Sequence, residues 1–302
     1  MNLRWFLYYC AAWGAFGGLV GWIVSLSVLM DKPVLQEAFK GMGLGLVLAI
    51  ILVLVDRAFN GFSWTVVPAV FVGAFVGGLG GFVGGMIAQI IYGSTQWNLS
   101  LVFGWTLTGL LIGASPGMFE LLARLARNQD TTGAFKKVRN GLMGGTIGGM
   151  LGGGFFLAVG YGWKRWLGID ATGLWSPTAI GFVILGACIG LLIGLVQVIF
   201  KDAWIKVESG FRAGRELILS RPEIIIGRAE GCDIALFGDQ GVDKLHARIV
   251  TRDGGYYVED IGSGGGTSVN GYGVIGLTRL NDGDLIEIGR SSLRFSAQGR
   301  TK

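Results

Sequence analysis

The polar residues best suited to chemistry gather in the last third of the sequence. Arg228 offers a planar fork of donors that matches a phosphate or a carboxylate. Asp243 and Lys244 stand just before His246, the only histidine of the chain. With a single histidine and three widely spaced cysteines, Ser-His-Asp catalysis, a His proton relay or a metal site with several His ligands is hard to build. We therefore expect anion binding here, with no catalytic residues, no metal and no cofactor.

A glycine-rich segment follows shortly afterwards and could imitate a phosphate-binding loop. It comprises Gly262 and residues 264–266. A nucleotide-binding loop leads from a strand into a helix and carries Gly-Lys-Ser/Thr. Here the segment precedes another β-rich stretch, and no such tripeptide follows. Nucleotide binding is rejected, and the modest net charge of +5 gives no reason to expect nucleic acid.

The elements that position these residues are short and β-rich. Residues 216–219, 223–226, 247–251, 256–259 and 285–288 alternate or are rich in Ile, Val and Leu, with Gly, Asn and Asp turns between them. Short strands at this spacing predict an all-β sandwich. We place this domain at 213–299, after a short linker at 203–212.

Within this sandwich, an ordered set of motifs resembles the forkhead-associated (FHA) domain family. The motifs are Ile226-Gly227-Arg228, Asp243-Lys244-Leu245-His246, the run from Asp260 to Gly271, and Gly283-Asp284. The resemblance covers about residues 210–297 and implies a β-sandwich whose loops read phosphothreonine on a partner protein. By the same resemblance, Arg228 contacts phosphate, while Gly227 and the bracing His246 are structural in the binding loops. The later motif is matched by Gly266, Thr267 and Asn270.

Three positions depart from the family pattern. Asp243 replaces the phosphate-binding Ser, Lys244 replaces the neighbouring Arg, and Gly265 replaces the peptide-binding Asn. Two unit charges about 5 Å apart repel by roughly 3 kcal/mol at an effective dielectric near 20. Asp243 is thus expected to weaken or abolish phosphothreonine binding, so that the loops bind an unmodified protein. Alternatively, Asp243 pairs with Arg228 and occupies the pocket internally.

The composition of the first two thirds of the chain predicts that it lies in a lipid bilayer. Only 15% of all residues are charged, 51% are apolar and 55 are glycine, which points to lipid rather than water. Long uncharged runs predict an α-helical, polytopic membrane domain over residues 1–202. Its first span is retained, because it is too long and aromatic for a signal peptide. The six expected spans are 5–30, 39–56, 64–92, 99–119, 141–163 and 176–200.

Glycines recur at every fourth position in the third and fifth spans, which favours close helix packing. Similar motifs around residues 13–18, 72–78 and 140–145 indicate three tandem helical hairpins. We expect the glycines to pack helices and to join copies of the chain into a homo-oligomer. The glycines assigned to this packing are Gly77, Gly81, Gly85, Gly145, Gly149 and Gly153.

Lys and Arg are commoner in the connections on the side of the N-terminus, so both termini are expected in the cytoplasm of a bacterial cell, with the spans in its inner membrane. The favoured function is a membrane-anchored adaptor whose FHA domain recruits a cytosolic protein, with or without phosphothreonine. The alternative is a channel or transporter regulated by that domain. No ionisable residue lies in the middle of a span, which argues against ion-coupled transport. A further hypothesis makes Thr131 or Thr132, in a basic inner loop, a phosphorylated FHA target.

Overall fold

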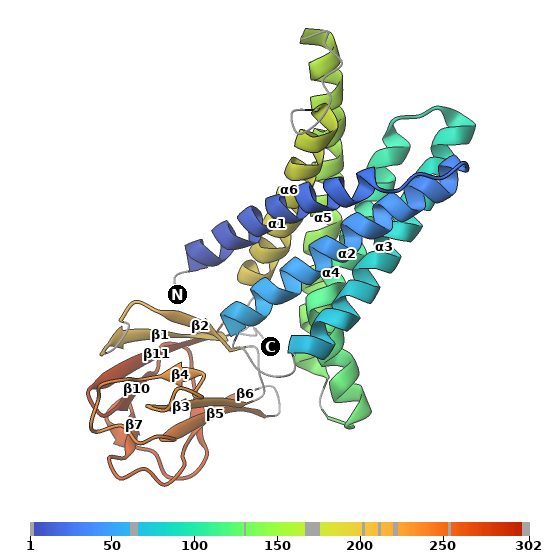
Figure 1. Cartoon of the computed structure of the whole chain (residues 1–302). Helices are drawn as coiled ribbons and strands as arrows, with labels where there is room; N and C mark the ends of the chain where they lie inside the picture. Colours follow the sequence, from blue (N-terminus) through green and yellow to red (C-terminus); the bar gives the residue numbers. More distant parts are fainter. Residues whose placement is uncertain are drawn as a thin grey trace. The chain divides into compact units, whose positions relative to one another are not determined.

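The computed structural model of the 302-residue chain consists of two compact units (Figure 1). A helical unit comprises Arg4–Phe200, and the second unit comprises Met1–Leu3 with Lys201–Lys302. The structure describes residues 3–60, 66–129, 131–166, 176–200, 203–210, 213–219, 223–252 and 255–297.

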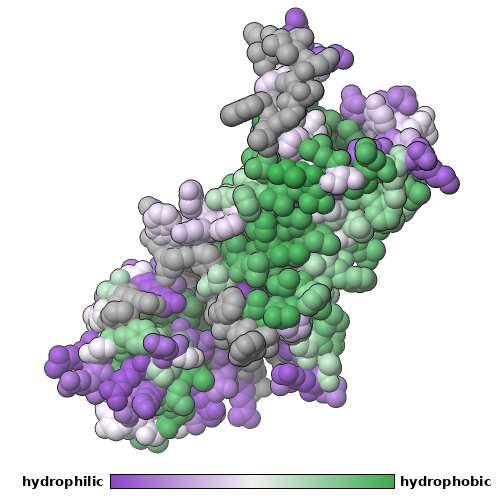
Figure 2. All heavy atoms as spheres, viewed as in Figure 1, coloured by the Kyte–Doolittle hydropathy of each residue, from purple (hydrophilic) through white to green (hydrophobic). Residues whose placement is uncertain are grey.

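The helical unit contains six helices, each long and apolar enough to cross a membrane. They are α1 Leu3–Leu26, α2 Pro33–Asn60, α3 Val66–Thr95, α4 Leu99–Ala126, α5 Thr132–Trp166 and α6 Pro177–Ile199. The prediction of six long apolar helices is confirmed, and these helices suggest a multi-pass membrane protein. In Figure 2, hydrophobic residues cover a broad area of this unit.

Three helices extend well beyond the predicted spans. α2 begins before Glu37, α4 continues past Arg124, and α5 begins before Lys136. The sequence boundaries had been set where charge begins. Charged residues do not end a helix, because Glu and Lys are good helix formers and the helix can continue through them into the membrane–water interface.

Glycines bring the helices together backbone against backbone. A Cβ added at Gly77 or Gly81 would collide with a carbonyl oxygen of α2, and one at Gly145 with a carbonyl oxygen of α4. Gly85 meets α2 in the same way, while Gly149 and Gly153 lie against Trp105 of α4. All six glycines assigned to packing are therefore covered within one chain. The expected homo-oligomer through these glycines stays a prediction.

The same contact recurs around the unit. Gly14 of α1 meets the backbone of Gly186 in α6, as Gly81 meets Gly41 and Gly145 meets Gly109. Each odd-numbered helix thus presses against an even-numbered helix that is not its own hairpin partner in the tandem-hairpin prediction. The recurrence supports an internal repeat, and these contacts join different repeats: the first to the second, the second to the third, and the third to the first.

Large aliphatic side chains fill the interior between the helices. Leu44 and Leu48 of α2, Ile112 of α4, and Leu185 and Ile189 of α6 are all fully buried. Thr106 and Thr146 donate their hydroxyls to carbonyls of their own helices, so these hydroxyls are used locally. In the described part of the bundle, the centre is a packed apolar core.

One buried ion pair links α2 with α5. The Lys137 ammonium lies 2.6 Å from the Asp56 carboxylate, which is only 3% exposed. Asp56 is near the C-terminal end of α2 and Lys137 near the N-terminal end of α5. Charges this well buried are held only when partnered, so the pair fixes the two helices at one end of the bundle.

The second unit is a β-sandwich. One sheet has the order β2-β1-β11-β10-β7-β8 and the other β4-β3-β5-β6-β9. The strands are β1 Ala203–Ser209, β2 Glu216–Ile218, β3 Glu223–Gly227, β4 Ile234–Ala235, β5 Ala247–Arg252, β6 Gly255–Asp260, β7 Thr267–Val269, β8 Tyr272–Gly273, β9 Thr278–Leu280, β10 Leu285–Ile288 and β11 Ser291–Ala297. Their inward residues, among them Ile205, Ile226, Ile249, Ile286 and Phe295, form one core.

The predicted linker at 203–212 is wrong, because most of it is β1. Ala203 pairs with Ala297, and β1 lies between β2 and β11 and is hydrogen-bonded on both sides. Its burial alternates as Ala203, Ile205 and Val207 point into the core. The sandwich therefore begins at Ala203 instead of residue 213. Its alternation was visible in the sequence but was attributed to a connection.

Strand register places the candidate loops at one end of the sandwich. Ile226 pairs with Ala247, and Ala247 pairs with Asp260, so the loops after β3, before β5 and after β6 lie together. We call this the loop end. The pair Ala203 and Ala297 lies at the opposite end, where the chain enters and leaves the sandwich.

Candidate functional site

At the loop end, the segment after β3 lies against the segment before β5. The backbone N–H of Arg228 donates to the carbonyl of Asp243 at 2.9 Å, and that of Ala229 donates to the carbonyl of Lys244 at 3.2 Å. A Cβ added at Gly227 would collide with the Lys244 carbonyl oxygen. Glycine at 227 is therefore what allows the two segments to approach this closely.

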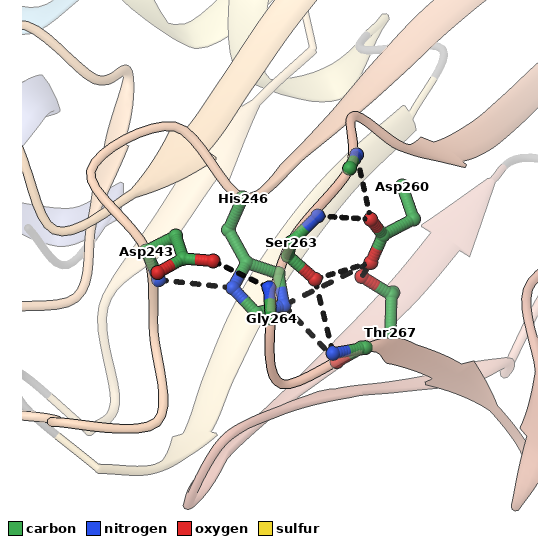
Figure 3. Close-up of polar contacts among 8 residues, drawn as sticks. Asp243, His246, Asp260, Ser263, Gly264 and Thr267 are labelled. Atoms are coloured by element: carbon green, nitrogen blue, oxygen red, sulfur yellow. Dashed lines mark hydrogen bonds and ion pairs between the residues drawn. The ribbon is translucent and has the colours of Figure 1, made fainter.

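His246 joins this pair of segments to the loop after β6. Its side chain is fully buried. Nδ1 accepts from the backbone N–H of Asp243 at 3.1 Å, and Nε2 lies 3.0 Å from the Gly266 carbonyl oxygen. Because a carbonyl only accepts, Nε2 carries the proton and the neutral ring spans the two loops (Figure 3). The ring is fully occupied as a structural brace.

The Asp243 carboxylate is held by the glycine-rich loop. Its Oδ2 accepts from the backbone N–H of Gly264 at 2.6 Å (Figure 3). Such a charge-assisted bond is about twice as strong as a neutral one. Within the described residues, no side-chain hydrogen bond or ion pair involves Arg228, whose side chain is exposed. The suggested pairing of Asp243 with Arg228 is thus replaced by a bond from Asp243 to the loop backbone.

A second carboxylate, Asp260, organises the same loop from inside. It accepts from the Gly262 N–H at 3.0 Å, from the N–H and hydroxyl of Ser263 at 2.7 Å each, and from the Thr267 hydroxyl at 2.7 Å. Burial acts to raise the pKa of Asp260, but the bonds from Ser263, Thr267 and Gly262 outweigh it and hold the pKa below its ordinary value. Sequence reasoning gave no role to Asp260 or Ser263. An Asp followed closely by Gly and Ser after a strand is the available signal, since Asp commonly bonds the backbone two residues on.

The remaining predicted residues divide between two places. Gly265 lies at the loop end, with its Cβ direction blocked by the Gly241 carbonyl, and Gly266 has a left-handed φ of 72°. Thr267 is 5% exposed and its hydroxyl bonds Asp260, so it stabilises the loop from within. Asn270 follows the far end of β7, away from the loop end.

The Asn270 side chain is engaged inside the domain. Its amide nitrogen donates to Asp284 at 2.8 Å, and its amide oxygen accepts from the Leu285 N–H at 2.9 Å. It bridges the turn after β7 to the start of β10. The structure therefore brings together Arg228, Asp243, Lys244 and Gly265, and it does not bring Asn270 to them.

The assembled site presents charged groups of both signs around an ordered backbone. Arg228 and Lys244 are exposed, and Asp243 is half-buried between the loops. Across the described ranges, no group of three His, Cys, Asp or Glu side chains could hold a metal ion. The arrangement can offer cationic donors to an anionic partner, with one fixed carboxylate beside them.

Comparison with known proteins shows which family this domain resembles. Residues 224–289 match the model of the FHA domain. The chain is 29% identical over 130 residues to FHA domain-containing protein FhaB of Mycobacterium tuberculosis, covering 43% of this chain and 83% of that protein. It is 37% identical over 89 residues to the oxoglutarate dehydrogenase inhibitor of Corynebacterium diphtheriae, covering 30% of this chain and 61% of that protein.

The same part of the chain also matches solved structures. One from a study of phosphothreonine-dependent FHA domain interactions is 28% identical, has a TM-score of 0.30, and covers 32% of this chain and 98% of that chain. The family model and the two-sheet sandwich identify the C-terminal part as an FHA domain. The FHA resemblance and the predicted fold class, a set of six long apolar helices followed by a β-sandwich, are confirmed.

Proposed function

We propose that this chain, which carries an FHA domain after six membrane-span helices, is a membrane-anchored adaptor that binds a protein partner without requiring phosphothreonine. FHA domains bind phosphothreonine-containing protein partners, which supports a recognition role for this one. The refinement to an unmodified partner rests on this chain's own residues.

The observation that carries the proposal is the position of the Asp243 carboxylate. The family resemblance assigns this position to a phosphate-binding Ser, and here a fixed negative charge bonds the Gly264 N–H. A bound phosphate carries about −1.5 to −2 charge. It would meet like charge next to Arg228 and would find that backbone donor already occupied. Gly265 also lacks the amide that the family uses for the peptide backbone.

The helical unit fits anchoring better than conduction. Its described interior is filled by fully buried aliphatic side chains, including Leu48, Ile112 and Leu185. The alternative of an FHA-regulated channel or transporter predicts solute flux in liposomes. The adaptor predicts none above that of empty liposomes.

We further propose that the spans lie in the inner membrane with both termini in the cytoplasm, as the Lys and Arg distribution indicates. α6 ends at Ile199 and β1 begins at Ala203, so the FHA domain lies on the side where α6 emerges. Fluorescent protein fused after Lys302 is expected to be fluorescent, and alkaline phosphatase fused there is expected to be inactive. The reverse pair of results would overturn the orientation.

The test of the proposed function is binding of paired peptide libraries to the full chain in nanodiscs. The two libraries are identical except that a central threonine is phosphorylated in one of them. Binding to the plain library, unimproved by phosphate, is the expected result. Binding confined to the phosphorylated library would refute phosphate independence and make the protein a membrane phospho-receptor.

A further inference from the structure

Four aliphatic side chains are exposed at the loop end of the FHA domain. Ile275 is 92% exposed, Leu245 53%, Leu277 45% and Ile261 38%. Single exposed aliphatic residues are common on soluble domains. Several at one end of a small domain, beside a binding loop, are the usual mark of an interaction surface.

Backbone hydrogen bonds and strand register place these residues at the same end of the domain. Leu245 directly precedes His246, whose carbonyl accepts from the Ile261 N–H at 3.0 Å. On the other sheet, the Val274 N–H donates to the carbonyl of Thr267 at 2.8 Å, which brings Ile275 beside the start of β7.

Leu277 completes the set. Thr278 pairs with Val258 on β6, so Leu277 lies toward the end of β6 that leads to Ile261. We call Leu245, Ile261, Ile275 and Leu277 the apolar rim. The rim extends across loops from both sheets, from the β4–β5 loop to the β8–β9 connection.

The rim is bordered by positive charge. The backbone bonds from Arg228 and Ala229 to Asp243 and Lys244 place the segment after β3 beside the segment that leads to Leu245, and the side chains of Arg228 and Lys244 are exposed. The neighbouring carboxylate of Asp243 is satisfied by Gly264. The charge balance therefore leaves the exposed Arg228 guanidinium able to take a carboxylate from outside the domain.

We propose that the loop end binds an unphosphorylated segment of another polypeptide that combines a carboxylate with aliphatic side chains. The carboxylate pairs with Arg228, and the aliphatic side chains cover the apolar rim. A carboxylate carries one negative charge, so Asp243 opposes it less than it opposes a phosphate. This inference rests on the proposed function and names the partner's chemistry.

The test uses the full chain in nanodiscs and three short peptide libraries with a central Glu, Gln or phosphothreonine. In each library, the flanking positions are either Leu and Ile or Ser. The Glu library with Leu and Ile flanks is expected to bind about tenfold or more tightly than its Ser-flanked counterpart, which is the effect of burying one or two aliphatic side chains.

Two variants locate the contact. Ile275→Ser is expected to weaken the best Glu peptide about fivefold or more, because a side chain that becomes buried on binding is lost. Tyr272→Ser is the matched control, since Tyr272 is 81% exposed and is the first residue of β8, at the end of the strand away from Ile275. Arg228→Gln is expected to remove the preference for Glu over Gln.

The outcomes separate this inference from the proposed function. Two results would overturn the role of the apolar rim and leave phosphate-independent binding in place. One is that unphosphorylated peptides bind as tightly with Ser flanks as with Leu and Ile flanks. The other is that Ile275→Ser and Tyr272→Ser weaken binding equally. Binding of the phosphothreonine library alone would overturn both. Failure of every library to bind would also reject the inference, because the contacts it requires are local and available to a short peptide.

Discussion

Replacing Asp243 by asparagine tests the central electrostatic argument. Asp243→Asn keeps the size of the side chain and an oxygen that can accept from the Gly264 N–H, and it removes the charge. Two unit charges about 5 Å apart repel by roughly 0.8 kcal/mol in water and roughly 3 kcal/mol at an effective dielectric near 20. Asp243 is half-buried, so an intermediate value of about 1.4–2.8 kcal/mol applies. This corresponds to about 10- to 100-fold in affinity.

The measurement is fluorescence anisotropy of a labelled phosphothreonine peptide and its plain form, with the full chain in nanodiscs. Asp243→Asn is expected to tighten the phosphopeptide by about 10- to 100-fold and to change the plain peptide little. The gain is expected to shrink as salt is raised, because the Debye length falls from about 10 Å at 0.1 M to about 3 Å at 1 M. Glu216→Gln removes an equal charge from β2, at the opposite edge of the sheet from β8, and serves as the control.

Two results would refute this reasoning. One is tight binding of the phosphopeptide by the natural chain with no change in Asp243→Asn, which would mean that the carboxylate does not face the phosphate. The other is an equal gain in phosphopeptide affinity in Glu216→Gln, which would mean that the effect depends on the net charge of the domain and not on the position of Asp243. Either result would remove the main support for phosphate-independent recognition.

Three further predictions concern stability. Lys137→Met removes the ammonium that pairs with the buried Asp56 carboxylate. We expect it to lower the free energy of unfolding by about 3–5 kcal/mol, measured as a lower Tm of the helical unit in detergent. An unchanged Tm would contradict the structural role of the pair. Gly81→Ala, whose Cβ would meet a carbonyl oxygen of α2, should lower the Tm by overpacking worth about 1–3 kcal/mol, whereas Gly154→Ala, with open space around it, should not. The pKa of Asp260 is lowered on folding, so its contribution to FHA stability is present above the unfolded value, near 3.8, and is lost as pH falls below it; Asp260→Asn should flatten the acid-unfolding curve over that range.

The helical unit shows which features a sequence can predict and which it cannot. Six apolar runs predict six helices because the length needed to cross a bilayer is fixed. The helices α2, α4 and α5 extend beyond the predicted spans because charge marks the border of the lipid and not the end of a helix. The glycine pattern predicts close packing, but it does not name the partner helix. Whether Gly81 meets a helix of its own chain or of a second copy depends on tertiary structure.

In the FHA domain, too, some features can be predicted from the sequence and others cannot. Ordered motifs were enough to find the fold and the candidate residues Arg228, Asp243 and His246, because each motif serves a particular turn or bond. The first strand was missed because β1 is separated from its partner β11 by most of the domain. Asp260 was missed for a similar reason, since its role depends on several weak bonds within one loop that no single residue type reveals.

The replacement of a hydroxyl by the Asp243 carboxylate was visible in the sequence, but its effect depends on geometry. A carboxylate paired with Arg228 would have neutralised the cation and left the loop end without an anion site. The observed bond to Gly264 instead fixes the glycine-rich loop with an anion that belongs to the chain itself, and it leaves the Arg228 guanidinium exposed. A loop ordered in this way needs no phosphate to order it, which is the physical reason to expect recognition that is independent of phosphorylation.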